Sequence, residues 1–452
     1  MKKTNTLISF FTQGNKRTLR AKKNITVSFI SKAISILIGF IIVPLTLSYI
    51  GEVEYGIWLT IASIISWFSF FDIGLGNGLR NKLAEALAKD DQETANVYIS
   101  STYALITIIA SIMFFGFFIV AYFISWNSAL NTDIITNNEL LKIILTVFFF
   151  FCLGFITKIL SSILQAMQKY AIDDILAVLA QILGLIAIFI LVNTTDSSLF
   201  NLCVVYGSKT AIVFISASFF LFSSSLKKYS PKFRNINLKK SLPLMNLGMW
   251  FFMNQILYLI VTQTSIILVV QFFGPADVTI FNLSFRYMTI VSMLYIMVLV
   301  PFLSAFTEAF TKNEFEWIRS TMKRINIIWL VASFGTLILV LVYKIFFRLW
   351  VGNEIIIPLT LIIGFGISSI VSTWVSTYTL FLNGIGKIRL QFRVQLLQAI
   401  LFFPLCFLFY KLNFGLVSLV IPGIIFAIMG AFIFPLQYKK IINQTAIGVW
   451  NR

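Results

Sequence analysis

The sequence predicts an all-α integral membrane protein of about twelve transmembrane helices, arranged as two pseudo-symmetric six-helix bundles around a central cavity. The 452 residues are 59% apolar and have a mean hydropathy of +0.92, whereas soluble domains are about 45–50% apolar. Apolar stretches of roughly twenty residues, the length that crosses a bilayer, recur along the whole chain. In addition, two loops of the first half are repeated in the second half at similar offsets.

Hydropathy places six spans in each half of the chain. The first six are expected near Asn24–Leu47, Tyr55–Gly76, Tyr98–Trp126, Leu140–Gln165, Ile175–Val192 and Leu199–Ser223. The second six are expected near Leu244–Phe273, Val278–Thr307, Ile325–Phe346, Ile355–Leu382, Leu390–Tyr410 and Phe414–Leu436. The chain then divides into a basic N-terminal segment (1–23), a first bundle (24–224), a basic linker (225–243), a second bundle (244–438) and a tail (439–452).

The distribution of Lys and Arg predicts that both chain ends lie in the cytoplasm. With that assignment, most Lys and Arg residues fall in cytoplasmic segments, while the external loops hold Lys344, Arg348 and Lys411. Membrane proteins retain positive loops on the cytoplasmic side. The same bias explains the net charge of +18 without a nucleic-acid partner.

An internal repeat predicts two similar halves. The loop Tyr49–Tyr55 after the first span resembles Phe272–Val278 after the seventh, and the turn Gln168–Tyr170 resembles Gly386–Ile388 after the tenth. The offsets, 274 − 51 = 223 and 387 − 169 = 218, are similar. Two halves in the same orientation, facing each other across a cavity, are the simplest arrangement that follows.

The residues argue against an enzyme. The chain has no histidine, no Walker A sequence and no pair of carboxylates at one membrane depth. Its three cysteines, Cys152, Cys203 and Cys406, all lie in apolar runs, so we expect neither disulfides nor a metal site. No cofactor is expected either.

One stretch stands out, the end of the second span followed by a charged segment. Here the chain reads Phe71-Asp72-Ile73-Gly74-Leu75-Gly76-Asn77-Gly78-Leu79-Arg80. A single acid at the base of a membrane helix is followed by glycines at alternate positions, which permit a bend or a close backbone approach. A loosely terminated helix end is the simpler interpretation, and the spacing is wrong for a dinucleotide-binding loop.

The run from Phe71 to Ala88 resembles the segment after the second membrane helix of Wzx-type polysaccharide flippases, in the MATE-like (MOP) exporter superfamily. The resemblance extends loosely over the whole chain. It implies a bacterial inner-membrane protein that moves undecaprenyl diphosphate-linked oligosaccharides, such as O-antigen or capsule repeat units, to the outer face by alternating access. The polysaccharide polymerase and glycosyltransferases are then possible partners beside the lipid. We expect Asp72, Gly74 and Gly76 to belong to the cytoplasmic gate, with Arg80 holding that end in register.

The charges inside the spans are positive. Lys32, Lys209 and Arg286 lie within predicted spans, whereas the acids are close to span ends. A cation facing lipid costs several kcal/mol, so these side chains should face a wet cavity, where they suit a diphosphate or an acidic sugar. The resemblance also implies a contrast, because the drug-exporting relatives in the same superfamily typically carry an acid in the first helix, where this chain has Lys32.

Each of these assignments has a structural alternative. Lys32 could extend to the membrane surface, Lys209 could bind backbone carbonyls, and Arg286 could be paired. Gln255, on a polar stripe of the seventh span with Thr262, could hydrogen-bond sugars or could join helices. We therefore expect substrate contacts at Lys32, Arg286, Lys209 and Gln255.

Two other functions stay open. A cation-coupled small-molecule or multidrug antiporter of the same fold would show ion dependence lost in Asp72→Asn. A non-transporting scaffold of a glycan-assembly complex would tolerate substitutions in the cavity.

Overall fold

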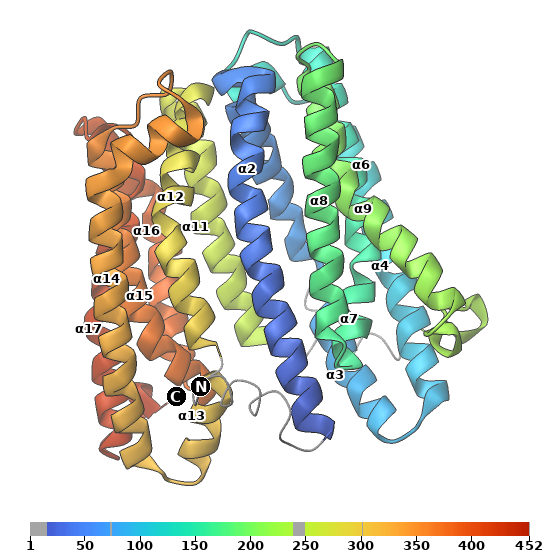
Figure 1. The fold of residues 1–452 in the computed structure, drawn as a ribbon, viewed down its shortest axis with the longest axis vertical. Coiled ribbons are helices and arrows are strands. Elements are labelled where there is room, and N and C mark those ends of the chain that lie inside the picture. The colour runs from blue at the N-terminus through green and yellow to red at the C-terminus, as the bar shows by residue number, and fades with distance from the viewer. Residues whose placement is uncertain (1–15, 73–74, 238–248, 301, 452) are drawn as a thin grey trace, which may run out of the picture. The chain divides into compact units, whose positions relative to one another are not determined.

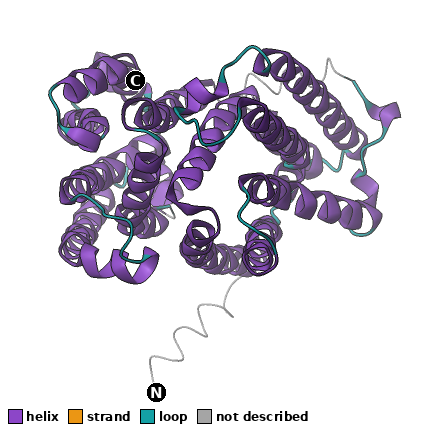
Figure 2. Ribbon diagram, turned by 90° about the horizontal axis from the view of Figure 1, so that it is seen from above, coloured by secondary structure: helices purple, strands orange, loops and turns teal. Residues whose placement is uncertain are grey.

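The structure, a computed structural model, describes residues 16–72, 75–237, 249–300 and 302–451. These residues form helices joined by turns and loops, with no strand among them, and Figure 2 views most of the helices close to end-on. They divide into two compact units. Unit 1 comprises Met1–Gly51, Phe68–Ala129 and Asp133–Met249, and unit 2 comprises Glu52–Trp67, Leu130–Thr132 and Trp250–Arg452.

Unit 1 contains the blue to green helices of Figure 1. They are α2 as far as Gly51 (α2 is Lys16–Ser66), η1 (Trp67–Asp72, from Phe68 on), α3 (Leu75–Ala88), α4 (Gln92–Ala121), α5 (Trp126–Leu130), α6 (Asn137–Thr157), α7 (Ile159–Ala166), α8 (Tyr170–Thr194), α9 (Leu199–Ser223), η2 (Lys227–Tyr229) and η3 (Phe233–Asn235). Side-chain caps define several starts. The side chains of Asp91, Thr136 and Ser198 accept from backbone N–H groups in the first turns of α4, α6 and α9.

Unit 2 contains the remainder of α2 and the yellow to red helices of Figure 1. They are α11 (Met249–Phe273), α12 (Pro275–Leu299), α13 (Phe302–Thr311), α14 (Phe315–Val351), α15 (Leu359–Gly384), α16 (Arg389–Lys411), η5 (Gly415–Leu419), α17 (Ile421–Ile442) and η6 (Gly448–Asn451). Proline begins α12 and lies in the first turn of α17, where its fixed φ suits a helix start.

The described helices supply twelve crossings of the membrane. Eleven helices in the described part of the chain are long and apolar enough to span a membrane. One of them, Thr26–Ser69, has 44 residues, which is about 66 Å of helix at 1.5 Å per residue. It breaks at Gly51, so it supplies two crossings of a core about 30 Å thick. The predicted fold class is confirmed.

Some predicted bounds were wrong. The second span was expected to reach Gly76, but its α-helix ends at Ser66 and is followed by the short η1. The eighth span was expected to reach Thr307, but α12 ends at Leu299 and α13 is a separate helix. Hydropathy stays high across both breaks, because the first is followed by the largely apolar η1 and the second by α13, which begins with Phe302 and Leu303.

Backbone conformation extends the internal repeat. Gly51 (φ 76°, ψ 178°) and Gly274 (φ 103°, ψ 173°) share a backbone conformation that is essentially restricted to glycine. Three further residues of the first half have a positive φ. For each of them, a residue 218–223 positions later in the chain has a positive φ as well. The pairs are Asp90 and Asn313, Asn131 and Gly352, and Gln168 and Gly386. Four turns therefore recur in the same order, where the sequence had indicated two.

The repeat also recurs in the packing. In unit 1 a buried cluster joins α3, α4 and α7 through Leu79, Ile99 and Leu160. In unit 2 a cluster joins the counterparts α13, α14 and α15 through Phe306, Ile318 and Phe381. Corresponding elements thus build the apolar core near the same end of each half.

The two parts of α2 pack on different units. In unit 1, Ser28 donates to the Asp174 carboxylate of α8, and the Tyr49 hydroxyl contacts Thr195 Oγ1 at 2.8 Å. In unit 2, Thr279 Oγ1 of α12 donates to the Glu52 carbonyl at 2.7 Å. We had expected Glu52–Trp67 in the first bundle, and the bounds of the two bundles stay a prediction.

Candidate functional site

Two cations lie halfway along their helices. Lys209 is the eleventh of 25 residues in α9, and Arg286 is the twelfth of 25 in α12. Both side chains are half-buried. By contrast, every Asp and Glu in the described spans lies in the first five residues of a helix or within three residues of Gly51. Among the described residues, the middle of the spans therefore carries positive charge.

Lys209 is held in place by three helices of unit 1. Its Nζ lies 4.6 Å from the centroid of the Tyr206 ring, one turn earlier in α9. The Tyr206 hydroxyl lies 3.0 Å from Thr46 Oγ1 of α2. On the other side the lysine stem passes directly over Gly184 of α8, where a Cβ would lie 2.7 Å from Lys209 Cδ. The ammonium group is thus positioned by an aromatic ring and by the absence of a side chain opposite it.

Lys32 occupies a different depth. It precedes Gly51 by 19 residues, which is about 28 Å of helix, so it lies near the far boundary of an apolar core about 30 Å thick. Its side chain is exposed. Ile30, Ile34, Leu37 and Ile41 form one exposed apolar stripe on this helix. Lys32 follows Ile30 by two residues, about 200° around the helix, and so lies on the side of α2 opposite that stripe.

Arg286 lies in unit 2, within electrostatic range of the buried Tyr55 hydroxyl. The chain after Gly51 packs closely on the start of α12, because a Cβ on Gly56 would lie 1.8 Å from the Pro275 carbonyl oxygen. One turn before Arg286, the buried Oδ1 of Asn282 accepts no hydrogen bond from any described residue. A half-buried guanidinium and an unsatisfied amide oxygen one turn apart can bind a polar group that carries both acceptors and donors.

The structure describes only part of the expected gate. Asp72 ends η1 but its side chain is not described, and Gly74 lies outside the described residues. Gly76 and Arg80 lie within α3, so Gly76 is a helical residue rather than a bend. The side chain of Gln255 in α11 also lies outside the description. Thr262 donates to the Tyr258 carbonyl of its own helix at 3.0 Å.

Sequence reasoning missed α3 as an amphipathic helix. Leu75, Leu79 and Leu83, spaced by four residues, are fully buried on one face. Beside this row of leucines, Lys82, Glu85 and Lys89 form two ion pairs of 2.8 and 2.9 Å, with side chains that are 38–69% exposed. These two lysines lower the pKa of the Glu85 carboxyl to about 2. The leucine spacing was a sufficient signal, but the charged residues had been taken as a water-facing segment.

These features define a multi-pass helical membrane protein with the fold of a secondary transporter. A structure of a multidrug resistance MATE family transporter of the MOP superfamily, in an inward-facing conformation, is similar with a TM-score of 0.70 at 13% identity, over 94% of this chain and 96% of that one. An outward-facing structure of such a transporter has a TM-score of 0.60 at 15% identity, over 94% and 96% of the two chains.

The family can be stated more closely. Residues 21–307 match the family described as "Polysaccharide biosynthesis protein", and the chain belongs to this family. It is 25% identical to "Putative O-antigen export protein" of Yersinia pseudotuberculosis over 92% of this chain and 94% of that protein. It is 27% identical to "Putative O-antigen transporter" of Salmonella typhi over 60% and 61% of the two chains. The resemblance seen at Phe71–Ala88 is thereby confirmed.

Proposed function

We propose that this protein is a flippase of the bacterial inner membrane that moves undecaprenyl diphosphate-linked oligosaccharide repeat units from the cytoplasmic to the outer face. The family and the O-antigen export relatives support the passenger class, and the MATE-type fold supports alternating access. The observation that carries the proposal is Lys209, whose side chain is held halfway along a membrane-spanning helix. The acids of the described spans, by contrast, lie only near helix starts or near the break at Gly51.

The anionic passenger follows from this charge pattern. A diphosphate loses hydration on entering the membrane, and a fixed ammonium or guanidinium group offsets that loss best where water is scarce. Lys209 and Arg286 would contact the diphosphate or acidic sugars at mid-depth, while the polyprenyl tail stays in the bilayer. Lys32, near the predicted cytoplasmic boundary, would receive the head group first, and Gln255 would hydrogen-bond the sugars.

The topology proposed for this mechanism has both termini in the cytoplasm. Asp72, Gly74, Gly76 and Arg80 would then lie at the cytoplasmic gate. The transport cycle makes and breaks no covalent bond, so the protein would act as a transporter and not as an enzyme. Polymerase and glycosyltransferases would meet the same lipid-linked substrate and are candidate partners.

The test is complementation of cells that lack this gene. We expect these cells to accumulate undecaprenyl-linked oligosaccharide that is inaccessible from outside, and to lose surface polysaccharide. Lys209→Gln and Arg286→Gln should fail to restore it at normal protein levels. Lys142→Gln, which removes an exposed charge near the start of α6, is the matched control.

Other outcomes would support the alternatives. Unchanged surface glycan with accumulation of a drug or cation inside the cells would favour the antiporter. Full complementation by both variants, Lys209→Gln and Arg286→Gln, together with copurification of transferases, would favour the scaffold.

A further inference from the structure

The segment that follows α9, residues 224–237, concentrates positive charge beside an exposed aromatic ring. It contains Lys227, Lys228, Lys232 and Arg234 and no acidic residue. All four side chains are exposed, and Phe233 between the last two is 94% exposed. In Figure 1 this segment forms the yellow-green turn at the edge of unit 1. An aromatic ring surrounded by cations fits a surface that is apolar and anionic at once.

The backbone of this segment is fixed to α4. Lys232 N donates to Ser100 Oγ at 3.0 Å, and Asn237 N donates to Ser101 Oγ at 2.7 Å. Both serines are buried, and each hydroxyl oxygen accepts one of these two hydrogen bonds. Leu226 is 1% exposed and belongs to the unit 1 core. The basic side chains therefore extend from a backbone that is fixed to unit 1.

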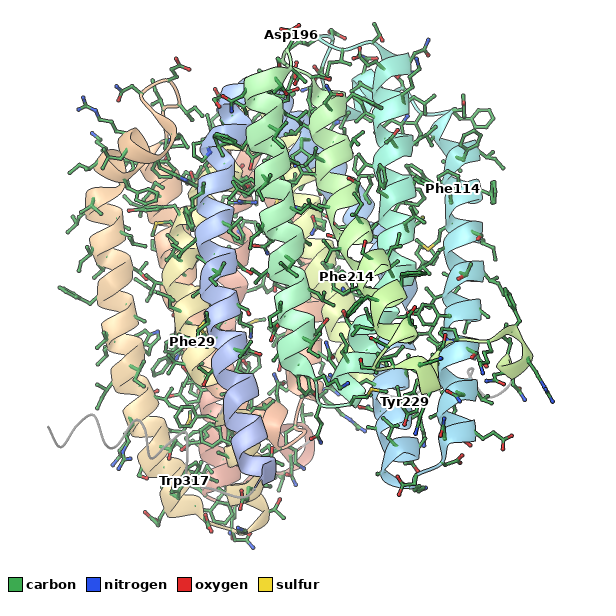
Figure 3. All side chains as sticks on the ribbon, turned by 45° about the vertical axis from the view of Figure 1, so that its right-hand side comes forward. Phe29, Phe114, Asp196, Phe214, Tyr229 and Trp317 are labelled. Atoms are coloured by element: carbon green, nitrogen blue, oxygen red, sulfur yellow. The ribbon has the colours of Figure 1, made fainter. Side chains whose placement is uncertain are left out.

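The segment lies where the helices leave the apolar layer. The last turns of α9 carry Phe219 and Phe220, which are 79% and 70% exposed and suit lipid. The chain turns immediately after Ser223 and docks on the ninth and tenth residues of α4, just before its apolar run. In Figure 3, Tyr229 of this segment lies toward the end of unit 1 opposite Asp196. We expect lipid head groups at this end of the apolar helices.

We propose that residues 224–237 form an interfacial anchor that binds anionic phospholipid head groups through Lys227, Lys228, Lys232 and Arg234 and inserts Phe233 among the acyl chains. Clusters of cations beside a span attract anionic lipid, and the attraction weakens as salt increases. The inference does not depend on what the protein transports.

Site-directed spin labelling tests the depth of Phe233. The full chain, with Cys152, Cys203 and Cys406 replaced by Ala and Phe233→Cys labelled, is placed in nanodiscs of phosphatidylcholine with or without one quarter phosphatidylglycerol. We expect the label to be accessible to oxygen and shielded from a water-soluble nickel reagent in the anionic discs. Replacing the four cations by Gln should move it toward water, whereas Lys344→Gln with Arg348→Gln should leave it in place.

A second measurement needs no cysteine change. Native mass spectrometry of the otherwise unmodified chain should show phosphatidylglycerol retained at least fivefold more by the parent protein than by the four-Gln variant. A label that is water-accessible in both discs would overturn the proposal and indicate a protein partner for this surface. Equal depth in both lipids, with equal lipid retention by both proteins, would overturn it as well.

Discussion

The ammonium group of Lys209 lies 4.6 Å from the centre of the Tyr206 ring, halfway along α9. The same ring is tied through its hydroxyl to Thr46 of α2. The lysine therefore has a defined position before any passenger arrives. A preorganised cation needs little rearrangement to bind an anion, and this improves affinity.

Gly184→Ala should displace Lys209 without unfolding the protein. The new Cβ would lie 2.7 Å from Lys209 Cδ, and a flexible side chain can move away from it. We expect surface glycan in complemented cells to fall about tenfold, the effect of losing about 1.4 kcal/mol of a charge-assisted contact. The melting temperature should stay near that of the parent protein.

Gly154→Ala is the matched control, because nothing lies within 4 Å of a Cβ at Gly154 of α6. Tyr206→Phe removes the hydroxyl bound to Thr46 but keeps the ring, so its effect should be smaller than that of Gly184→Ala. Unchanged glycan in Gly184→Ala would contradict a transport role for the position of Lys209.

Gly56→Ala should destabilise unit 2. Its Cβ would lie 1.8 Å from the Pro275 carbonyl oxygen, and backbone on both sides cannot yield as a side chain can. Overpacking of this kind costs about 1–3 kcal/mol or more. Thermal unfolding in detergent should show a lower melting temperature than for Gly423→Ala, where nothing lies within 4 Å. Equal melting temperatures would show that Glu52–Trp67 does not pack on α12 this closely.

Gly51→Ala should lower the stability of the protein at the break between the first two crossings. The cause would be backbone strain and not a steric clash of the new Cβ. Gly51 has φ 76° and ψ 178°, while nothing lies within 4 Å of a Cβ there. Forcing alanine into this region costs about 1–3 kcal/mol. Gly39→Ala, in the helical part of α2 with free space around it, should instead be neutral or stabilising. Melting curves of the two variants, measured in parallel, check this prediction.

The ion pairs on α3 predict an acid-dependent contribution to stability. Lys82 and Lys89 lower the folded-state pKa of Glu85 from 4.5 to about 2. The contribution is therefore fully present above pH 4.5 and is lost as the pH falls through about 2. Glu85→Gln should melt below the parent protein at pH 7, and the difference should shrink between pH 4.5 and 2. Glu354→Gln, which removes one carboxylate from an exposed loop, is the control variant.

The sequence predicted the helical class, the number of crossings and the family. Bilayer thickness requires a long apolar run in every span, so the helical class and the number of crossings can be predicted from local composition. It also indicated two of the four repeated turns. The others, at Asp90 with Asn313 and at Asn131 with Gly352, became visible as a shared positive φ and not as shared residue type.

The helix bounds near η1 and α13 were less predictable. Hydropathy measures how apolar a residue is and does not say whether lipid or another helix covers it. The leucines of α3 face α7 within unit 1, although in sequence they read as the continuation of a span followed by charges.

The sequence by itself determined that cations lie inside the spans of a twelve-helix membrane protein, because charge and apolar length are properties of single residues and short runs. The tertiary structure decided how Lys209 is held, since Thr46, Gly184 and Tyr206 come from three helices and no pattern along the chain links them. It also decided that Lys32 lies at another depth, because the position of Gly51 along α2 sets the distance from the far membrane surface.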